Sequence, residues 1–305
     1  MKRTFSQKTL GGNLVLLLTA FIWGVAFVAQ KSGGDELGSL TFNGVRSLIG
    51  CGALFAAIPL LDKLGLSRRC DSPAQRKTLW VGGILCGLAL FSATNTQQLG
   101  IAETSVGKSG FITALYIVLV PLLGLFFGKR ATLWNWLGVV LAVAGLYLLC
   151  APDEGGINRG DLLLLACALL FSVQIMLVDR YAPQVDGVRL SCIQFLVVGV
   201  LNLPLMFTLE QPSLPAMAAN WLPLLYAGVL SSGVAYTLQI VAQKYTHPTT
   251  ASLLMSFESV FAALAGWVLL GDTLSLTEGI GCVLMFAAVT VAQLPGRKEK
   301  QNGQV

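Results

Sequence analysis

Ten long apolar segments divide this chain of 305 residues, with mostly short polar loops between them. A helix needs about 20 apolar residues to cross a hydrocarbon core of roughly 30 Å, and backbone groups in lipid must be hydrogen-bonded within their own segment. The segments therefore predict an all-α integral membrane protein rather than a barrel of strands. The expected spans are 11–30, 37–61, 78–99, 104–128, 132–150, 158–178, 187–208, 220–243, 249–271 and 275–294.

The charge of the loops alternates along the chain and predicts which helix ends share a side of the membrane. Sixteen lysines and arginines fall in loops that would share one face, whereas the other face receives Lys31 and Arg159. Short cytoplasmic loops keep Lys and Arg, so we expect the N- and C-termini to be cytoplasmic.

The composition argues against several other classes of protein. Only 11% of the residues are charged, where about 25% is typical of soluble proteins. The basic residues that give the net charge of +5 lie in loops beside apolar spans, where they orient the chain and contact anionic lipid. We therefore expect no nucleic-acid partner. Seven cysteines without a CxxC motif and one histidine predict neither a metal site nor a disulfide framework.

A short stretch resembles a nucleotide-binding loop, but its setting is wrong. Residues 102–109 come within one residue of the phosphate-binding loop, with Ala102 in place of the first glycine. That loop joins a strand to a helix in a soluble domain, whereas this stretch joins two membrane segments. We therefore expect no ATP and no other cofactor.

The ten spans divide into two groups of five, in residues 1–150 and 151–305. Because five is odd, the second group enters the membrane from the opposite side, which is the geometry of an inverted repeat. A shift of 143 positions also superposes residues of the two groups. It carries Gly128, Leu133, Gly138, Val140 and Leu141 onto Gly271, Leu276, Gly281, Val283 and Leu284.

Several short motifs, in this order and spacing, carry a resemblance to a known family. They are Trp23-Gly24 with Lys31, Arg46, the segment 110–116 running to Pro121, and the segment 257–261 running to Gly271-Asp272. With them the chain resembles the drug/metabolite transporter superfamily, specifically its bacterial EamA-type members with ten helices. The resemblance implies a transporter of the bacterial inner membrane that exports amino acids, related metabolites or drugs.

The chain also departs from the family pattern. Ser259 stands where many relatives have Pro, and Asp272 replaces a common Glu. Small multidrug resistance relatives carry a central Glu in their first helix, but this chain has none between Leu14 and Val28. A proton-coupling mechanism built on that Glu therefore cannot be transferred to this chain.

Two ionisable residues are expected deep in the membrane. Arg46 and Glu258 each lie nine residues into a span, roughly 14 Å from its entry surface at 1.5 Å per residue. Insertion of a charge there costs about 2.5–3.5 kcal/mol, so each should face the bundle and find a partner. Substrate or proton binding and a structural role remain open for Glu258, and the structural role is favoured for Arg46.

Other polar and aromatic residues are candidates to line a pathway. Lys108 is expected to extend toward water, with a substrate contact as the alternative. Asn95, Gln97 and Gln98 make the end of the third span unusually polar, and Gln239 is a sparser counterpart in the eighth. They could line a cavity or bridge helices.

The aromatic residues Trp23, Tyr116 and Tyr236 could stack on an organic solute, with packing or the interfacial aromatic belt as the alternative.

The favoured hypothesis is a secondary transporter of a small organic solute, working by alternating access with proton or exchange coupling. We expect a monomer or a weak homodimer. The alternatives are an integral-membrane enzyme acting on a lipid-like substrate, a channel, or a non-transporting membrane partner.

Overall fold

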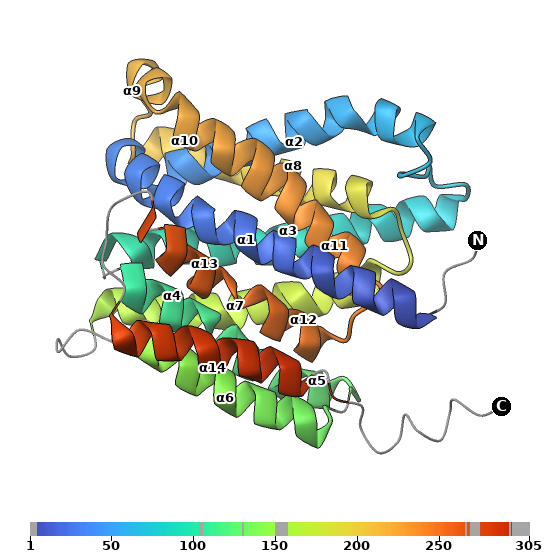
Figure 1. Ribbon diagram of the computed structural model, residues 1–305. Coiled ribbons are helices and arrows are strands. Elements are labelled where there is room, and N and C mark those ends of the chain that lie inside the picture. The colour runs from blue at the N-terminus through green and yellow to red at the C-terminus, as the bar shows by residue number, and fades with distance from the viewer. Residues whose placement is uncertain are drawn as a thin grey trace.

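The computed structural model describes residues 5–103, 106–129, 131–149, 158–265, 267–268, 275–292 and 294. Every regular element in these ranges is a helix (Figure 1). They are α1 (Phe5–Leu37), α2 (Ser39–Lys63), α3 (Pro73–Glu103), α4 (Val106–Ala114), α5 (Tyr116–Phe126), α6 (Leu133–Leu149), α7 (Arg159–Tyr181), α8 (Gly187–Leu209), α9 (Leu214–Ala219), α10 (Trp221–Leu225), the π-helix η1 (Tyr226–Ala235), α11 (Tyr236–Gln243), α12 (Pro248–Met255), α13 (Glu258–Ala265) and α14 (Leu276–Ala292). The prediction of an all-helical protein is confirmed.

Within these ranges, seven helical segments are long and apolar enough to cross a membrane, and two shorter apolar helices accompany them. The seven are Leu10–Gly34, Ser39–Lys63, Pro73–Glu103, Ser109–Phe126, Arg159–Tyr181, Gly187–Leu209 and Trp221–Gln243.

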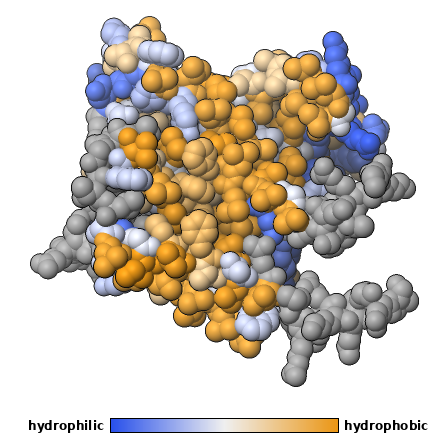
Figure 2. Space-filling view, viewed as in Figure 1, coloured by the Kyte–Doolittle hydropathy of each residue, from blue (hydrophilic) through white to orange (hydrophobic). Residues whose placement is uncertain are grey.

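Large apolar side chains such as Phe55, Leu162 and Val283 are exposed on the helices. Figure 2 shows a broad hydrophobic surface between more hydrophilic ends. An apolar surface of this extent belongs in lipid. The count of ten spans and the side of each terminus stay predictions.

Two expected spans are not single helices. Span 104–128 is interrupted at Leu115, between α4 and α5, and span 249–271 at Ser256 and Phe257, between α12 and α13. The Ser256 hydroxyl donates to the Leu253 carbonyl oxygen at 2.9 Å. Such bonds compete with the main-chain ladder and bend helices. The structure therefore divides each of these two expected spans into two helices; residues 266 and 269–271 lie outside the described ranges.

The span expected at 220–243 is helical throughout but changes its winding. It begins as α10, widens into η1 over ten residues, and continues as α11. A π-helix has a wider turn than an α-helix, and short π-helical stretches are frequent at functional sites.

The helices pack mainly across the two halves of the chain. Helix α14 lies along α6 in the lower part of Figure 1, and α2 packs against α8 in the upper part. Helix α3 packs against α7 and α8, and α1 packs against α13.

One end of the bundle gathers the basic loops, and we refer to it as the basic end. The loops after α2, α5, α7 and α11 lie there, together with the start of α1 and the end of α14 (right side of Figure 1). Ion pairs join helices at this end. Arg189 Nη2 lies 2.7 Å from Asp62 Oδ2, linking α8 to α2, and Lys129 pairs with Asp179 of α7. This arrangement agrees with the grouping of the loops by charge.

Candidate functional site

An internal cavity lies where helices from both halves of the chain meet. Its walls come from α1, α2, α3, α5, α7, η1, α11, α12 and α13. The lining residues are Trp23, Phe27, Gln30, Arg46, Gln97, Tyr116, Phe171, Gln174, Ile175, Ser231, Tyr236, Gln239, Met255 and Glu258. Its volume is about 40 Å³. The cavity is therefore narrow.

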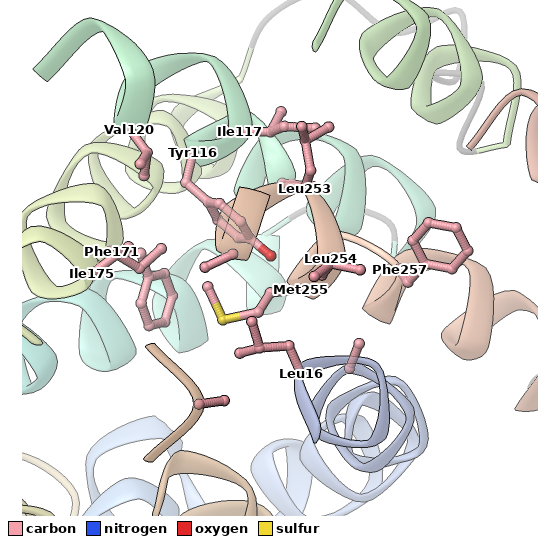
Figure 3. Packing of buried hydrophobic residues seen from close by; sticks show 14 of the residues in the cluster. Leu16, Tyr116, Ile117, Val120, Phe171, Ile175, Leu253, Leu254, Met255 and Phe257 are labelled. Carbon is pink, nitrogen blue, oxygen red and sulfur yellow. The ribbon is translucent and has the colours of Figure 1, made fainter. Parts of the chain in front are cut away.

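Part of the wall is aromatic and apolar. Figure 3 shows the Tyr116 ring reaching from α5 toward Met255 of α12, with Phe171 and Ile175 of α7 nearby. Trp23 and Tyr236 lie with ring centroids 4.6 Å apart, and Phe195 meets Tyr236 edge-on at 5.3 Å. The three aromatic candidates, Trp23, Tyr116 and Tyr236, therefore line the same cavity.

Glu258 and Tyr116 stand at the two helix breaks. Each is the first residue of its helix, α13 and α5 respectively, and both are buried. The Tyr116 hydroxyl donates to Glu258 Oε1 at 3.0 Å. The N–H groups of Ser259 and Phe261 donate across the break to the carbonyl oxygens of Ser256 and Phe257, at 3.2 and 3.0 Å. Among the described residues, the side-chain partner of the carboxylate is therefore the Tyr116 hydroxyl. No cation among the described residues lies within ion-pair distance of Glu258.

Arg46 is buried in α2 with 5% of its surface exposed. Its guanidinium carbon lies 5.6 Å from the centroid of the Phe42 ring. The described residues supply neither a hydrogen-bond acceptor nor a carboxylate for this guanidinium, so Arg46 and Glu258 do not form an ion pair. Two opposite charges thus face the same cavity without neutralising each other.

Glycines allow α2 and η1 to pack closely against each other beside Arg46. A Cβ added at Gly228 of η1 would lie 2.6 Å from Ile49 Cγ2 and 3.0 Å from the Arg46 carbonyl oxygen. A Cβ at Gly50 of α2 would lie 2.8 Å from the Gly228 carbonyl oxygen. Only glycine allows α2 and η1 to pack this closely, as small residues do in many membrane bundles.

Gly24 allows a similarly close contact of α1 with α13, beside Glu258. A Cβ at Gly24 of α1 would lie 2.4 Å from Phe261 Cβ and 2.8 Å from the Glu258 carbonyl oxygen. Gly24→Ala must push α1 away from α13, and overpacking of this kind costs about 1–3 kcal/mol. We expect the thermal unfolding midpoint in detergent to fall. Gly52→Ala is the matched control, because nothing lies within 4 Å of a Cβ at Gly52. Equal midpoints for the two variants would contradict the close approach.

The amide candidates separate into two groups. Gln97 and Gln239 line the cavity, whereas Asn95 and Gln98 bridge helices. Asn43 of α2 donates to Asn95 Oδ1 at 3.0 Å, and Gln98 Nε2 donates to the Gln30 carbonyl oxygen of α1 at 3.2 Å.

Lys108 falls within α4, but its side chain lies outside the described residues. Its role therefore stays a prediction.

The sequence interpretation missed two further glutamines in the cavity wall, Gln30 of α1 and Gln174 of α7. A signal was present, because Phe-x-x-Gln occurs at 27–30 and again at 171–174, 144 positions later. The Phe and the Gln of both motifs line the cavity: Phe27, Gln30, Phe171 and Gln174.

Comparisons with known proteins place the chain in a family. The model of the EamA-like transporter family matches it twice, over residues 10–151 and 158–293. An uncharacterized transporter of Archaeoglobus fulgidus is 30% identical over 293 residues, which cover 94% of this chain and 87% of the relative. The uncharacterized inner membrane transporter YedA of Escherichia coli K12 is 27% identical over 279 residues, covering 88% of this chain and 87% of YedA.

A solved crystal structure shares the fold. It superposes with a TM-score of 0.75 over 96% of this chain and 98% of the other, at 21% sequence identity. The two family matches together cover nearly the whole sequence, and the relatives are named transporters. The chain belongs to the EamA-like transporter family of the drug/metabolite transporter superfamily and is a multi-pass membrane protein.

Proposed function

We propose that this protein is a secondary transporter for a small organic solute that carries both a carboxylate and an ammonium group, such as an amino acid. The observation that carries the proposal is a pair of opposite charges on the wall of one cavity, Arg46 and Glu258, neither of which has an ion-pair partner among the described residues. A guanidinium binds a carboxylate through two parallel hydrogen bonds, and a carboxylate accepts from an ammonium group. A zwitterion satisfies both groups at once, whereas a neutral solute leaves both charges unpaired.

The rest of the cavity wall suits the remainder of such a solute. Phe27, Phe171, Ile175 and Met255 offer apolar contact. Trp23 Nε1 is a buried donor without an acceptor in the described structure. Ligand sites commonly combine an apolar lining with a few placed polar groups.

The narrowness of the cavity supports alternating access. A cavity of about 40 Å³ is too small for an amino acid, so helices must move apart to admit one. Interrupted helices at a central site are a recurring feature of secondary transporters, and here the interruptions precede Tyr116 and Glu258.

The proposal includes two inverted repeats, residues 1–150 and 151–305. Helix contacts support it. Exchange of the halves maps the contact of α3 with α7 onto that of α11 and η1 with α1, and the contact of α1 with α13 onto that of α7 with α5. The pairs α2–α8 and α6–α14 map onto themselves. The helix breaks suggest an offset of 142 in this region, which pairs Glu258 with Tyr116 rather than with Leu115, the residue that an offset of 143 selects. Cys51 and Cys192, 141 positions apart, also meet, with their sulfur atoms at 3.8 Å.

The location and direction of transport belong to the same proposal. The basic loops at one end support cytoplasmic termini by the positive-inside rule. The family relation to an inner membrane transporter of Escherichia coli supports the bacterial inner membrane. Export from the cytoplasm follows from the family resemblance alone.

Counterflow in proteoliposomes tests the function. The panel compares amino acids with their esters, which lack the carboxylate, and with hydroxy acids, which lack the ammonium group, each with and without a pH gradient. We expect exchange of at least one amino acid and much weaker exchange of its two analogues. Equal exchange of all three, or no exchange of any amino acid, would overturn the proposal. The pH-gradient arm separates proton coupling from simple exchange.

A further inference from the structure

Four glutamines of the cavity wall form two corresponding sets. Gln30 and Gln174 are 144 positions apart, and Gln97 and Gln239 are 142 positions apart. Gln30 and Gln97 belong to α1 and α3 in the first half, and Gln174 and Gln239 belong to α7 and α11 in the second. Under the proposed repeat, the pair Gln30/Gln97 is the counterpart of the pair Gln174/Gln239. All four are buried and line the same cavity.

The two pairs lie toward opposite ends of the bundle. Gln174 lies seven residues before α7 ends at Tyr181, and Gln239 lies four residues before α11 ends at Gln243, and both helices end at the basic end (Figure 1). Gln30 lies seven residues before α1 ends at Leu37, and α1 ends at the other side. Gln97 likewise lies six residues before the end of α3 at Glu103.

The pairs differ in their hydrogen bonding. Gln239 Nε2 donates to Gln174 Oε1 at 3.3 Å, which joins α11 to α7 at the basic end. No such bond joins Gln30 to Gln97 in the described structure. The side-chain oxygen of Gln30 is buried and has no donor among the described residues.

Resting on the function proposed above, we infer that the two pairs are alternating contacts that hold opposite ends of the cavity closed in turn. In this conformation the bond between Gln174 and Gln239 holds the basic end together. Exchange of conformations between inverted repeats breaks this bond and forms its counterpart between Gln30 and Gln97, because each repeat then adopts the arrangement of the other. The four glutamines are therefore positioning residues that determine from which side the solute reaches Arg46 and Glu258.

The energetics of amides suit this role. A neutral hydrogen bond contributes only about 1 kcal/mol net. A buried amide left unpaired is costly, so each pair favours its closed form without locking it. Because one bond replaces the other, the two conformations keep similar free energies, as a transporter that cycles between them requires.

Hydrogen–deuterium exchange of the whole protein tests the inference without a known solute. Gln174→Leu/Gln239→Leu removes the contact at the basic end. We expect exchange in loop segments 182–186 and 244–247 to rise about fivefold, the population change that corresponds to one lost hydrogen bond. Exchange around Gly38 and in 210–213, at the other end, should fall.

The reciprocal variant and a control complete the test. Gln30→Leu/Gln97→Leu should leave exchange at the basic end unchanged or lower. Gln194→Leu removes a buried amide that does not line the cavity and whose side chain has no hydrogen-bond partner among the described residues, so it should alter neither end selectively. A rise at both ends in the first variant, or a rise at the basic end in the second, would overturn the inference.

The test separates this inference from the proposed function. Opposite responses of the two ends without counterflow of any amino acid would uphold the alternating contacts and reject the zwitterion as solute. Counterflow of amino acids with identical responses at both ends would reject the contacts and leave the transporter standing.

Discussion

Glu258→Gln is expected to weaken the binding of a zwitterionic solute at least about 30-fold while leaving the fold intact. Loss of one partner of a buried, hydrogen-bonded charge pair costs about 2–5 kcal/mol, and every 1.4 kcal/mol is a factor of ten in affinity. Glutamine has nearly the same shape as glutamate, and its side-chain oxygen can accept the bond that Tyr116 donates at 3.0 Å. The measurement is the dissociation constant by calorimetry in detergent, alongside the unfolding midpoint.

Tyr116→Phe is the matched control for Glu258. It removes the hydrogen bond to the carboxylate but keeps the negative charge, so it should weaken binding by much less than Glu258→Gln. If both variants lose the same affinity, the hydrogen bond from Tyr116 matters as much as the charge of Glu258. If Glu258→Gln binds and exchanges solute as the wild type does, Glu258 does not contact the solute.

Arg46→Met is expected to abolish binding of carboxylate-bearing solutes while the unfolding midpoint stays at or above that of the wild type. Removal of one member of a buried ion pair destabilises a protein strongly, because it leaves the other charge uncompensated. Arg46 has no such partner in the described structure, so its replacement strands no charge. A buried unpaired guanidinium is itself unfavourable, and methionine fills a similar volume without that cost.

Arg46→Lys separates charge from geometry. It keeps the positive charge but loses the planar group that binds a carboxylate with two hydrogen bonds, so we expect weakened rather than abolished binding. A large fall in the unfolding midpoint of Arg46→Met, with solute binding retained, would instead give Arg46 the structural role that the sequence interpretation favoured.

The apolar helices and the two buried charges could be predicted from sequence because both follow from the cost of polar groups in lipid, whereas the count of ten spans stays a prediction. Arg46 and Glu258 stand out in apolar segments, and the structure brings them to one cavity with Tyr116, Tyr236 and Trp23. Their lack of mutual pairing could not be predicted, since it depends on how two helices rotate about their axes.

The helix breaks and the wider glutamine set were missed for a related reason. A helix interrupted at Leu115 has no proline or glycine at the break, so local propensity does not reveal it. Isolated glutamines such as Gln30 and Gln174 resemble ordinary bridging residues until the repeat places them in corresponding positions. Asn95 and Gln98 do bridge helices, which shows that residue type alone does not separate the two roles.

The ten-residue π-helix η1 limits which changes the eighth span can accept during evolution. Its turn holds more residues than an α-turn, so the segment accommodates extra chain length between α10 and α11. Loss of one residue inside η1 can narrow a wide turn to an α-turn and leave the phase of α11 unchanged. The same loss in α11, between Tyr236 and Gln239, would rotate Gln239 by about 100° away from the cavity, the angle per residue of an α-helix. In this span the length of η1 is therefore under weaker constraint than the length of α11.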